Sequence, residues 1–187
     1  IIDVKNSGLI SFDALPLFFK YSNKRGNAVG NLPIPLNGSG VIPEQAFEVV
    51  NNVIKNMNIV LEQLIPNLTI GIKVIGTQTM KNGETGYIIE LISKKNKKEI
   101  ALRYESEGIK KIVSILQLLI VVYNNDSITV AIDELDSGIF EYLLGEILRI
   151  ISEKGNGQLI FTSHNLRPLE TIDKGFIAFT TTNVNNR

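Results

Sequence analysis

Cysteine is absent from the 187 residues, histidine occurs once, and neither sign of charge is in excess. Without cysteine the chain has neither a disulfide framework nor a thiolate metal site, which is compatible with a reducing cytoplasm. Lysine plus arginine and aspartate plus glutamate number 19 each, so no global basic field points to nucleic acid or to an anionic membrane surface. The length and a hydrophobic share of 44% fit one globular domain, or one with a small appendage.

Long apolar runs and targeting segments are lacking as well. The most apolar window, residues 112–123, carries Ser114 and Gln117 and is shorter than the roughly 20 apolar residues that a membrane span needs. We therefore expect a buried helix there and no membrane association. The chain begins at Ile1 with neither an initiator methionine nor a signal pattern, so we interpret it as part of a longer cytoplasmic protein.

Residues 1–105 form the first of two predicted parts, which combines loops, one helix and antiparallel hairpins. Apolar residues recur every three to four positions after Pro43, and a strand-forming composition interrupted by turns such as Lys81-Asn-Gly-Glu follows. The expected elements are a short strand at 15–19, loops over 21–40, a helix over 43–65, and a meander of strands at 69–79, 86–93 and 99–104.

Residues 106–187 form the second predicted part, in which strands and helices alternate. This alternation favours a parallel α/β layer. Ser106 is a credible N-cap for the first helix, and Gly155-Asn-Gly157 would end the second. The expected elements are helices over 107–123 and 139–154, strands at 127–132 and 158–162, a short helix or turn over 168–172, and a last strand at 176–181.

An apolar strand that ends in two adjacent acids occupies residues 127–134. A run without polar alternation suits a strand buried on both faces, and carboxylates at its carboxyl end lie where open α/β sheets bind ligands. This is the form of a Walker B element, in which Asp133 would hold Mg²⁺ and Glu134 would orient or deprotonate the attacking water. The alternative for this stretch alone is a buried strand that ends in a polar turn.

Chemistry-bearing segments occur in a fixed order along the second part. Residues 105–108 precede an apolar helix, the acidic strand 128–134 follows, and the apolar strand 159–164 ends in the single histidine. Over about residues 101–169 this order resembles the C-terminal lobe of ABC-type P-loop ATPases. It is most similar to the AAA-family ATP-binding proteins of prokaryotes, related to the overcoming-lysogenisation-defect (OLD-like) and chromosome-maintenance ATPases. The resemblance implies an α/β fold of P-loop NTPase type.

The same resemblance implies that the chain contributes to a site for ATP and Mg²⁺. Asp133 matches the Walker B aspartate that binds the metal, and Glu134 matches the catalytic glutamate. His164 matches the switch histidine that contacts the γ-phosphate, and a neutral imidazole can donate one hydrogen bond to phosphate. A single histidine after a strand is otherwise a capped structural residue, and its place one strand beyond the acids favours the functional interpretation.

Nucleotide contacts from a second subunit, in a head-to-tail dimer, are also implied by the resemblance. Ser106 and Gly108 match the signature motif, in which a hydroxyl and a helix N-terminus face the γ-phosphate, and Ser137 lies in the D-loop region. Four residues depart from the family pattern. The usual leucine, first glycine and glutamine of the signature motif are here Glu105, Glu107 and Ile109, and Glu107 puts a negative charge near the phosphate. Phe140 replaces the aspartate that ends the D-loop in transporters. The alternative for the signature segment is a serine-capped buried helix.

A Walker A motif is missing from the sequence. No G-x-x-x-x-G-K-[S/T] occurs, and where glycines have that spacing, at Gly71 and Gly76, Thr77-Gln78 follows. We therefore expect the phosphate cradle and its lysine upstream of Ile1. We also expect this polypeptide alone to bind ATP poorly or not at all.

The predicted function is that of the C-terminal part of an ATP-hydrolysing ABC-type ATPase, which dimerises around nucleotide and drives an effector such as a nuclease or a DNA-bound partner. The alternative is a non-catalytic ATPase-like lobe for nucleotide sensing or dimerisation, which Glu107 and Phe140 favour. A DNA-binding fragment is a third possibility. It would use the lysines of residues 94–98 with Lys110 and Lys111, although a charged, solvated hairpin tip also explains the first group.

Overall fold

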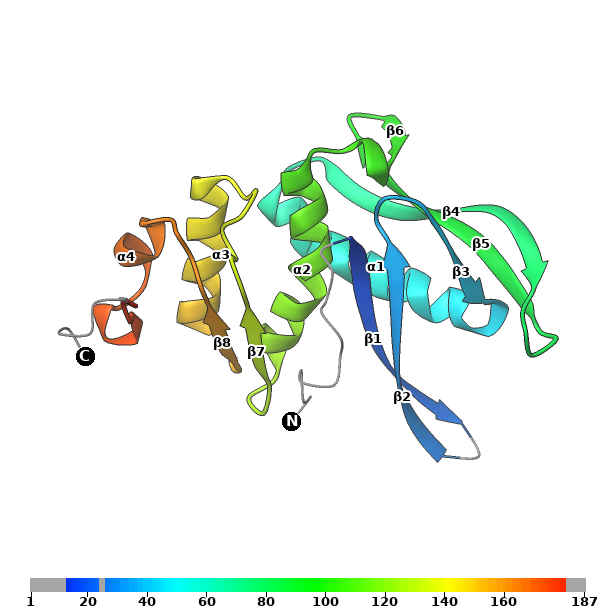
Figure 1. The fold of residues 1–187 in the computed structure, drawn as a ribbon, viewed down its shortest axis with the longest axis horizontal. Coiled ribbons are helices and arrows are strands. Elements are labelled where there is room, and N and C mark those ends of the chain that lie inside the picture. Colours follow the sequence, from blue (N-terminus) through cyan, green and yellow to red (C-terminus); the bar gives the residue numbers. More distant parts are fainter. Residues whose placement is uncertain (1–12, 24–25, 181–187) are drawn as a thin grey trace.

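The computed structural model describes residues 13–23 and 26–180, which form a mixed α/β fold of antiparallel strands, one parallel strand pair and helices (Figure 1). The elements in chain order are β1 (Ala14–Asn23), β2 (Gly26–Pro35), β3 (Ser39–Pro43), α1 (Phe47–Leu64), β4 (Leu68–Thr79), β5 (Thr85–Lys95), β6 (Lys98–Ala101), α2 (Glu107–Asn124), β7 (Thr129–Ile132), α3 (Glu141–Lys154), β8 (Gln158–Phe161) and α4 (Arg167–Thr171). Short 3-10 turns occupy Glu44–Ala46, Leu102–Tyr104 and Lys174–Phe176.

β5 is the central strand of the antiparallel sheet. Along one edge it pairs with β4, and along the other it pairs with β3 at residues 86–90 and with β6 at residues 92–95. The predicted meander of three strands is confirmed, except that the third strand, β6, ends at Ala101 and residues 102–104 form a 3-10 turn. β3 joins the sheet from earlier in the chain. Asn96 and Lys97 in the β5–β6 turn have φ values of 49° and 66°, as a two-residue hairpin loop requires.

The prediction of loops over residues 21–40 is wrong for residues 21–23, 26–35 and 39–40, which are strand, and holds for residues 36–38, which form a bend between β2 and β3. Residues 24 and 25 lie outside the described residues. β1 continues to Asn23, and β2 pairs with it antiparallel along its full length. The composition, rich in glycine, asparagine and proline, suggested turns. Leu32, Ile34 and Leu36 nevertheless pack inward at the period of two that a strand requires. Pairing with β1 and burial of these side chains outweigh the weak local strand propensity.

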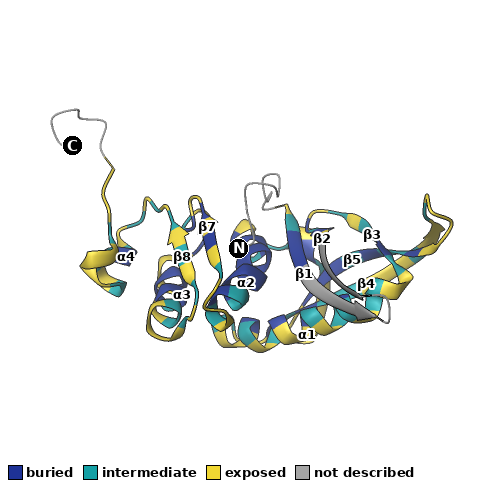
Figure 2. Ribbon diagram, turned by 90° about the horizontal axis from the view of Figure 1, so that it is seen from below, coloured by how far each residue is buried: buried dark blue, intermediate teal, exposed yellow. Residues whose placement is uncertain are grey.

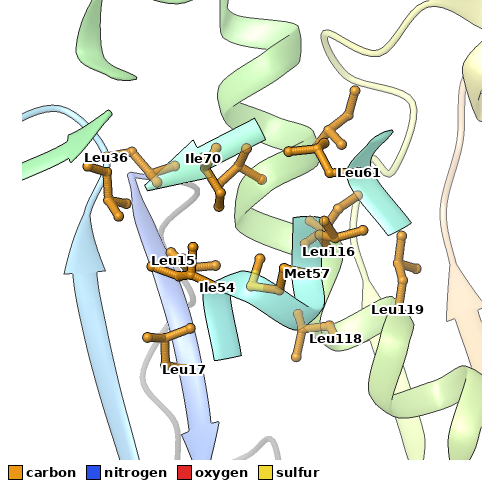
Figure 3. Close-up of a cluster of buried hydrophobic side chains, with 14 of the residues drawn as sticks. Leu15, Leu17, Leu36, Ile54, Met57, Leu61, Ile70, Leu116, Leu118 and Leu119 are labelled. Carbon is orange, nitrogen blue, oxygen red and sulfur yellow. The ribbon is translucent and has the colours of Figure 1, made fainter. Parts of the chain in front are cut away.

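α2 lies at the centre of the hydrophobic core. Figure 3 shows Leu116 and Leu118 of α2 with Ile54 and Met57 of α1 and Leu15 of β1. Each such side chain contributes about 1.5–3 kcal/mol on burial, and one continuous cluster extends from β1 to α3. The buried helix expected around residue 115 is confirmed, and none of the helices in the described residues is long and apolar enough to cross a membrane. The division of the chain at residue 105 stays a prediction.

β7 and β8 form the parallel pair of the C-terminal half, with Ile132 level with Phe161. Val130 and Ile132 pack into the core cluster with α2 and α3, whereas Ala131 is exposed. β8 alternates in the same way, Ile160 is 52% exposed, and Figure 2 shows exposed residues along both strands. The expectation that the acidic strand is buried on both faces is therefore wrong within this chain, because the described residues cover only one face of the pair.

The last predicted strand, residues 176–181, is not formed over its described part. α4 follows β8 where a short helix was expected, and after the turn at Lys174–Phe176 residues 177–180 have no regular structure. Phe176 and Phe179 are exposed, and no described strand pairs with this segment. A strand-forming composition is insufficient where no neighbouring strand takes up the backbone hydrogen bonds.

Candidate functional site

The carboxyl ends of β7 and β8 lie side by side and continue to pair just beyond the strands (Figure 1). The Thr162 amide donates to the Ile132 carbonyl at 3.1 Å, and the Leu135 amide donates to the Thr162 carbonyl at 3.0 Å. Because parallel strands end at the same edge of a sheet, these bonds place the residues after Ile132 beside those after Phe161. The acidic turn and the histidine loop are therefore neighbours.

Thr162 links the two segments through its side chain. Its hydroxyl is hydrogen-bonded to the Asp133 carboxylate and also accepts the backbone N–H of Glu134 at 2.8 Å. The register of the pair puts Thr162 level with Asp133, one step beyond Ile132 and Phe161. One threonine thus orients the first acid and fixes the backbone of the second.

Glu134 and His164 come together at this edge. The Glu134 Oε1 atom lies 3.8 Å from the His164 Nε2 atom, and the side chains are 58% and 86% exposed. This separation is too long for a hydrogen bond, and the pair attracts electrostatically only when the imidazole is protonated. Glu134 has a φ of 47°, a left-handed conformation that is uncommon for a residue other than glycine. Backbone outliers of this kind concentrate at functional sites.

Asp136 holds the loop that carries His164. Its carboxylate accepts the backbone N–H of His164 at 3.2 Å and that of Asn165 at 3.1 Å. The Asn165 side chain in turn accepts the backbone N–H of Arg167 at the start of α4. The loop after β8 is therefore fixed to the loop after β7 by a carboxylate, with two charge-assisted hydrogen bonds.

Lys111 approaches the acidic turn from α2. Its side chain is buried, and its Nζ atom donates to the Glu134 backbone carbonyl at 3.3 Å. Burial lowers the pKa of the Lys111 ammonium below its usual 10.5, and the nearby carboxylates of Glu134, Asp136 and Asp133 partly offset that shift. The helix that follows the signature segment is thus tied to the acids within one chain.

The assignment of Lys110 and Lys111 to a DNA-binding surface is corrected by the structure. Both side chains are buried, and Lys110 Nζ lies 3.0 Å from Asn37 Oδ1 and 2.5 Å from Glu107 Oε1. Buried and bonded ammonium groups are not available for phosphates. The lysines of residues 94–98 are exposed at the β5–β6 turn, where Lys94 pairs with Glu99, as a solvated hairpin tip would.

The first turn of α2 packs against the turn that follows the acids. Ser106 caps the helix, as predicted, by accepting the backbone N–H of Ile109 at 3.3 Å. Gly108 is buried, and a Cβ atom there would lie 2.4 Å from the carbonyl oxygen of Gly138. Glycine at 108 is therefore required by close backbone approach, whatever it binds. Ser137, in the same turn, is exposed and donates its backbone N–H to the Glu134 carbonyl at 3.0 Å.

The donor set at this edge suits a magnesium ion that keeps much of its hydration shell. No group of three or more histidine, aspartate or glutamate side chains in the described residues is arranged to hold a metal. Mg²⁺ needs no such group, because it binds through one or two carboxylates together with waters and phosphate oxygens. The exposed Asp133 carboxylate, oriented by Thr162, fits that role.

Comparison with solved structures finds chains of similar fold. An Smc head bound to the C-terminal winged-helix domain of ScpA superimposes with a TM-score of 0.52 at 14% identity, over 70% of this chain and 40% of that one. An SMC ATPase, from a study of ATP-driven dimerisation and DNA-stimulated activation, gives a TM-score of 0.51 at 14% identity, over 69% of this chain and 78% of that one. The Smc head domain with a coiled coil and joint from Pyrococcus yayanosii gives a TM-score of 0.50 at 15% identity, over 67% of this chain and 24% of that one.

Over about 70% of its length, the chain is similar in fold to SMC ATPase heads. This likeness confirms the ABC-type ATPase fold at a coarse level, while the relation to the OLD-like branch stays a prediction. The chain spans 40% of the length of the ScpA-bound Smc head. No protein-family model matches the sequence, and neither does any curated protein sequence.

Sequence reasoning missed the residues that hold the site together: Thr162, Asp136 and Lys111. Thr162 could have been found, because two parallel strands that end together place it opposite Asp133. Asp136 and Lys111 are recognisable only once the loops after both strands and the first turns of α2 are placed in space. Of the residues that were predicted, Glu134 and His164 come together, and Asp133 is bonded to Thr162 at the same edge. Gly108 packs against the turn that contains Ser137.

Proposed function

We propose that this chain supplies the acid-and-histidine half of an ATP-hydrolysing, ABC-type site. One observation carries the proposal: the Glu134 carboxylate and the His164 imidazole follow different strands, yet lie 3.8 Å apart where both strands end. A general base has to be within reach of the water that it activates, and both side chains are open to a ligand from solvent. The ATPase fold shared with SMC heads supports this assignment.

In this proposal each residue has a separate task toward bound Mg²⁺·ATP, which supplies the reactive γ-phosphoryl group. Asp133 would hold the metal through its carboxylate, which Thr162 orients. Glu134 takes a proton from the attacking water. His164 donates a hydrogen bond from its imidazole to the γ-phosphate, and Asp136 keeps its loop in place.

The phosphate cradle comes from a separate segment, since the 187 residues contain no Walker A motif. We expect that segment to pack on the uncovered face of β7 and β8, where Ala131 and Ile160 are exposed. Parallel sheets have both faces covered in nearly all proteins, and apolar side chains on the open face favour a protein partner over solvent. Covering this face would give β7 the two-sided burial that its sequence predicts.

The other subunit of a dimer would complete the site, as in an ABC-type nucleotide sandwich. Ser106 is exposed at the N-terminus of α2, a position from which a hydroxyl and a helix N-terminus can meet a phosphate. Glu107 forms an ion pair with Lys110, which offsets part of the negative charge there. A homodimer formed around ATP and Mg²⁺, acting on a nuclease or a DNA-bound partner in the cytoplasm, is the assembly that we propose.

Glu134→Gln tests the catalytic role in the complete ATPase, in which this chain is combined with its P-loop segment. Loss of a general base costs about 10²–10⁴-fold in rate, so kcat should fall at least about a hundredfold while ATP still binds. Glu62→Gln, at an exposed position of α1, is the matched control and should leave turnover unchanged. The proposal fails if the unmodified complete protein hydrolyses no ATP, or if Glu134→Gln is as fast as it.

A non-catalytic lobe for nucleotide-dependent dimerisation is the second candidate, and Phe140 favours it. This side chain is 77% exposed at the position where the D-loop aspartate of transporters stands. An aromatic side chain cannot make the hydrogen bond of that aspartate but can bury its ring against a partner. Dimerisation on addition of ATP, measured by light scattering, together with no turnover would favour this candidate over the first.

A further inference from the structure

The segment that carries His164 is held mainly through its backbone. The His164 side chain is 86% exposed, so packing does little to fix it, and its 3.8 Å approach to Glu134 is not a hydrogen bond. The backbone N–H groups of His164 and Asn165, in contrast, both point at the Asp136 carboxylate, at 3.2 and 3.1 Å. The Asn165 N–H also lies 3.0 Å from the hydroxyl oxygen of Ser163 within the same loop, whereas the His164 N–H bonds to Asp136. The loop therefore places the imidazole, and the Asp136 carboxylate bonds this loop to the turn after β7.

The geometry makes Asp136 a bridge between two catalytic segments. It follows Glu134 by two residues, in a turn where the Ile139 amide donates to the Asp136 carbonyl at 3.0 Å and the Ser137 amide donates to the Glu134 carbonyl at 3.0 Å. The same residue thus belongs to the turn that presents Glu134 and bonds to the loop that presents His164. A shift of either segment relative to the other has to break hydrogen bonds to a charged acceptor, which are stronger than those between neutral groups.

We propose that Asp136 is a positioning residue that sets the separation of Glu134 and His164 by anchoring the histidine loop to the acidic turn. The role in turnover rests on the proposed function, whereas the anchoring itself does not. Asp136 touches neither water nor phosphate in this scheme and acts through His164. Misplacement of a catalytic group by about 1 Å can cost up to about a hundredfold in rate, so the anchor matters although it does no chemistry.

Turnover in a double-mutant cycle tests the role in the complete ATPase. Asp136→Ala should lower kcat by about tenfold or more with KM for ATP little changed, and Asp136→Asn, which keeps one acceptor oxygen for both amides, should recover most of the loss. In a His164→Ala background Asp136→Ala should change kcat by less than about twofold, because the residue through which it acts is gone. Equal losses in both backgrounds, as a general folding defect would give, overturn the proposal.

Amide hydrogen exchange on this 187-residue chain tests the anchor without reference to ATP. Asp136→Ala should speed exchange at His164 by about tenfold or more, and at Asn165 by less, because the Asn165 amide also bonds to the Ser163 hydroxyl at 3.0 Å. Asp136→Asn should speed exchange at both amides less than Asp136→Ala does. Asp173→Ala is the matched control, because Asp173 also accepts a backbone N–H, that of Gly175 at 2.7 Å, outside this pair of loops. Unchanged exchange at His164 and Asn165 overturns the inference. If Asp136→Ala speeds exchange but the complete protein hydrolyses no ATP, the anchoring role of Asp136 is supported and the proposed function is refuted.

Discussion

The ammonium of Lys111 donates a hydrogen bond to the backbone carbonyl of Glu134 from a helix that starts at the signature segment. The contact holds Glu134 in its left-handed conformation together with the hydroxyl of Thr162, which accepts the Glu134 amide. Both backbone groups of the candidate base are therefore bonded to side chains from other elements. The acidic turn is fixed from the α2 side and from the β8 side at once.

Lys111→Met should alter the pH dependence of stability. Burial lowers the Lys111 pKa in the folded chain below 10.5, so between the two values the unfolded chain binds more protons. The contribution of Lys111 to the free energy of unfolding should therefore rise as pH rises toward about 10.5. The carboxylates of Glu134, Asp136 and Asp133 favour the charged ammonium and so make this rise smaller. Urea unfolding from neutral pH to about pH 10 measures the difference between the variant and the unmodified chain. Lys55→Met, at an exposed position of α1, controls for loss of charge, and a difference that does not change with pH would contradict this account.

Gly108→Ala should destabilise the chain by about 1–3 kcal/mol, because overpacked sites cost that amount. Alanine is the better helix former, so propensity alone predicts a gain of about 1 kcal/mol. The added Cβ would lie 2.4 Å from the Gly138 carbonyl oxygen, a backbone atom that cannot move aside without displacing the turn after the acids. Thermal unfolding of the variant shows whether the substitution lowers or raises the stability of the chain. Gly38→Ala, where no atom lies within 4 Å of the new Cβ, should be nearly neutral.

Thr162→Val should weaken the site, whereas Thr162→Ser should not. Valine removes the hydroxyl that bonds to Asp133 and that accepts the Glu134 amide, at a cost of about 0.5–1.5 kcal/mol in stability. Because Asp133 would hold the metal, we also expect the complete ATPase with Thr162→Val to need more Mg²⁺ for half-maximal turnover. A magnesium titration of the two variants measures this. Equal midpoints for valine and serine would exclude a role for the hydroxyl.

Ile160→Lys should weaken binding of the P-loop segment while leaving the stability of this chain nearly unchanged. The side chain is 52% exposed on the open face of β8, so the charge should change the stability of this chain by less than about 0.5 kcal/mol. If the P-loop segment covers this face, the lysine should weaken its binding at least about tenfold in a titration with that segment, because an unpaired charge would be buried. Ile59→Lys, at a site 63% exposed on α1, should leave binding unchanged. The same weakening by both variants would argue against this docking face.

Much of the fold could be predicted from local pattern. The apolar stripe of α1, the turn at Lys81-Asn-Gly-Glu and the apolar body of α2 give helices and a hairpin within a few residues of the observed bounds. The failures concern segments whose state depends on distant partners. β2 is a strand because β1 lies beside it, and residues 177–180 have no regular structure because no described strand pairs with them.

The candidate site divides in the same way. Asp133, Glu134 and His164 could be predicted because each follows a strand that its own sequence predicts. The supports could not be predicted from spacing, since Lys111 reaches Glu134 from 23 residues away and Asp136 reaches Asn165 across 29. Lys110 and Lys111 even suggested the opposite environment, because two adjacent lysines are usually solvated and here both are buried.

The left-handed backbone of Glu134 has a consequence for selection on this protein. A non-glycine residue in a sparsely populated conformation costs on the order of 1–3 kcal/mol, and glycine would adopt a φ of 47° without that penalty. If stability alone were under selection, replacing Glu134 with glycine would therefore be favoured. In the proposed function, glutamate at 134 keeps a general base at a cost in stability. Without selection for turnover, glycine should then be the favoured replacement.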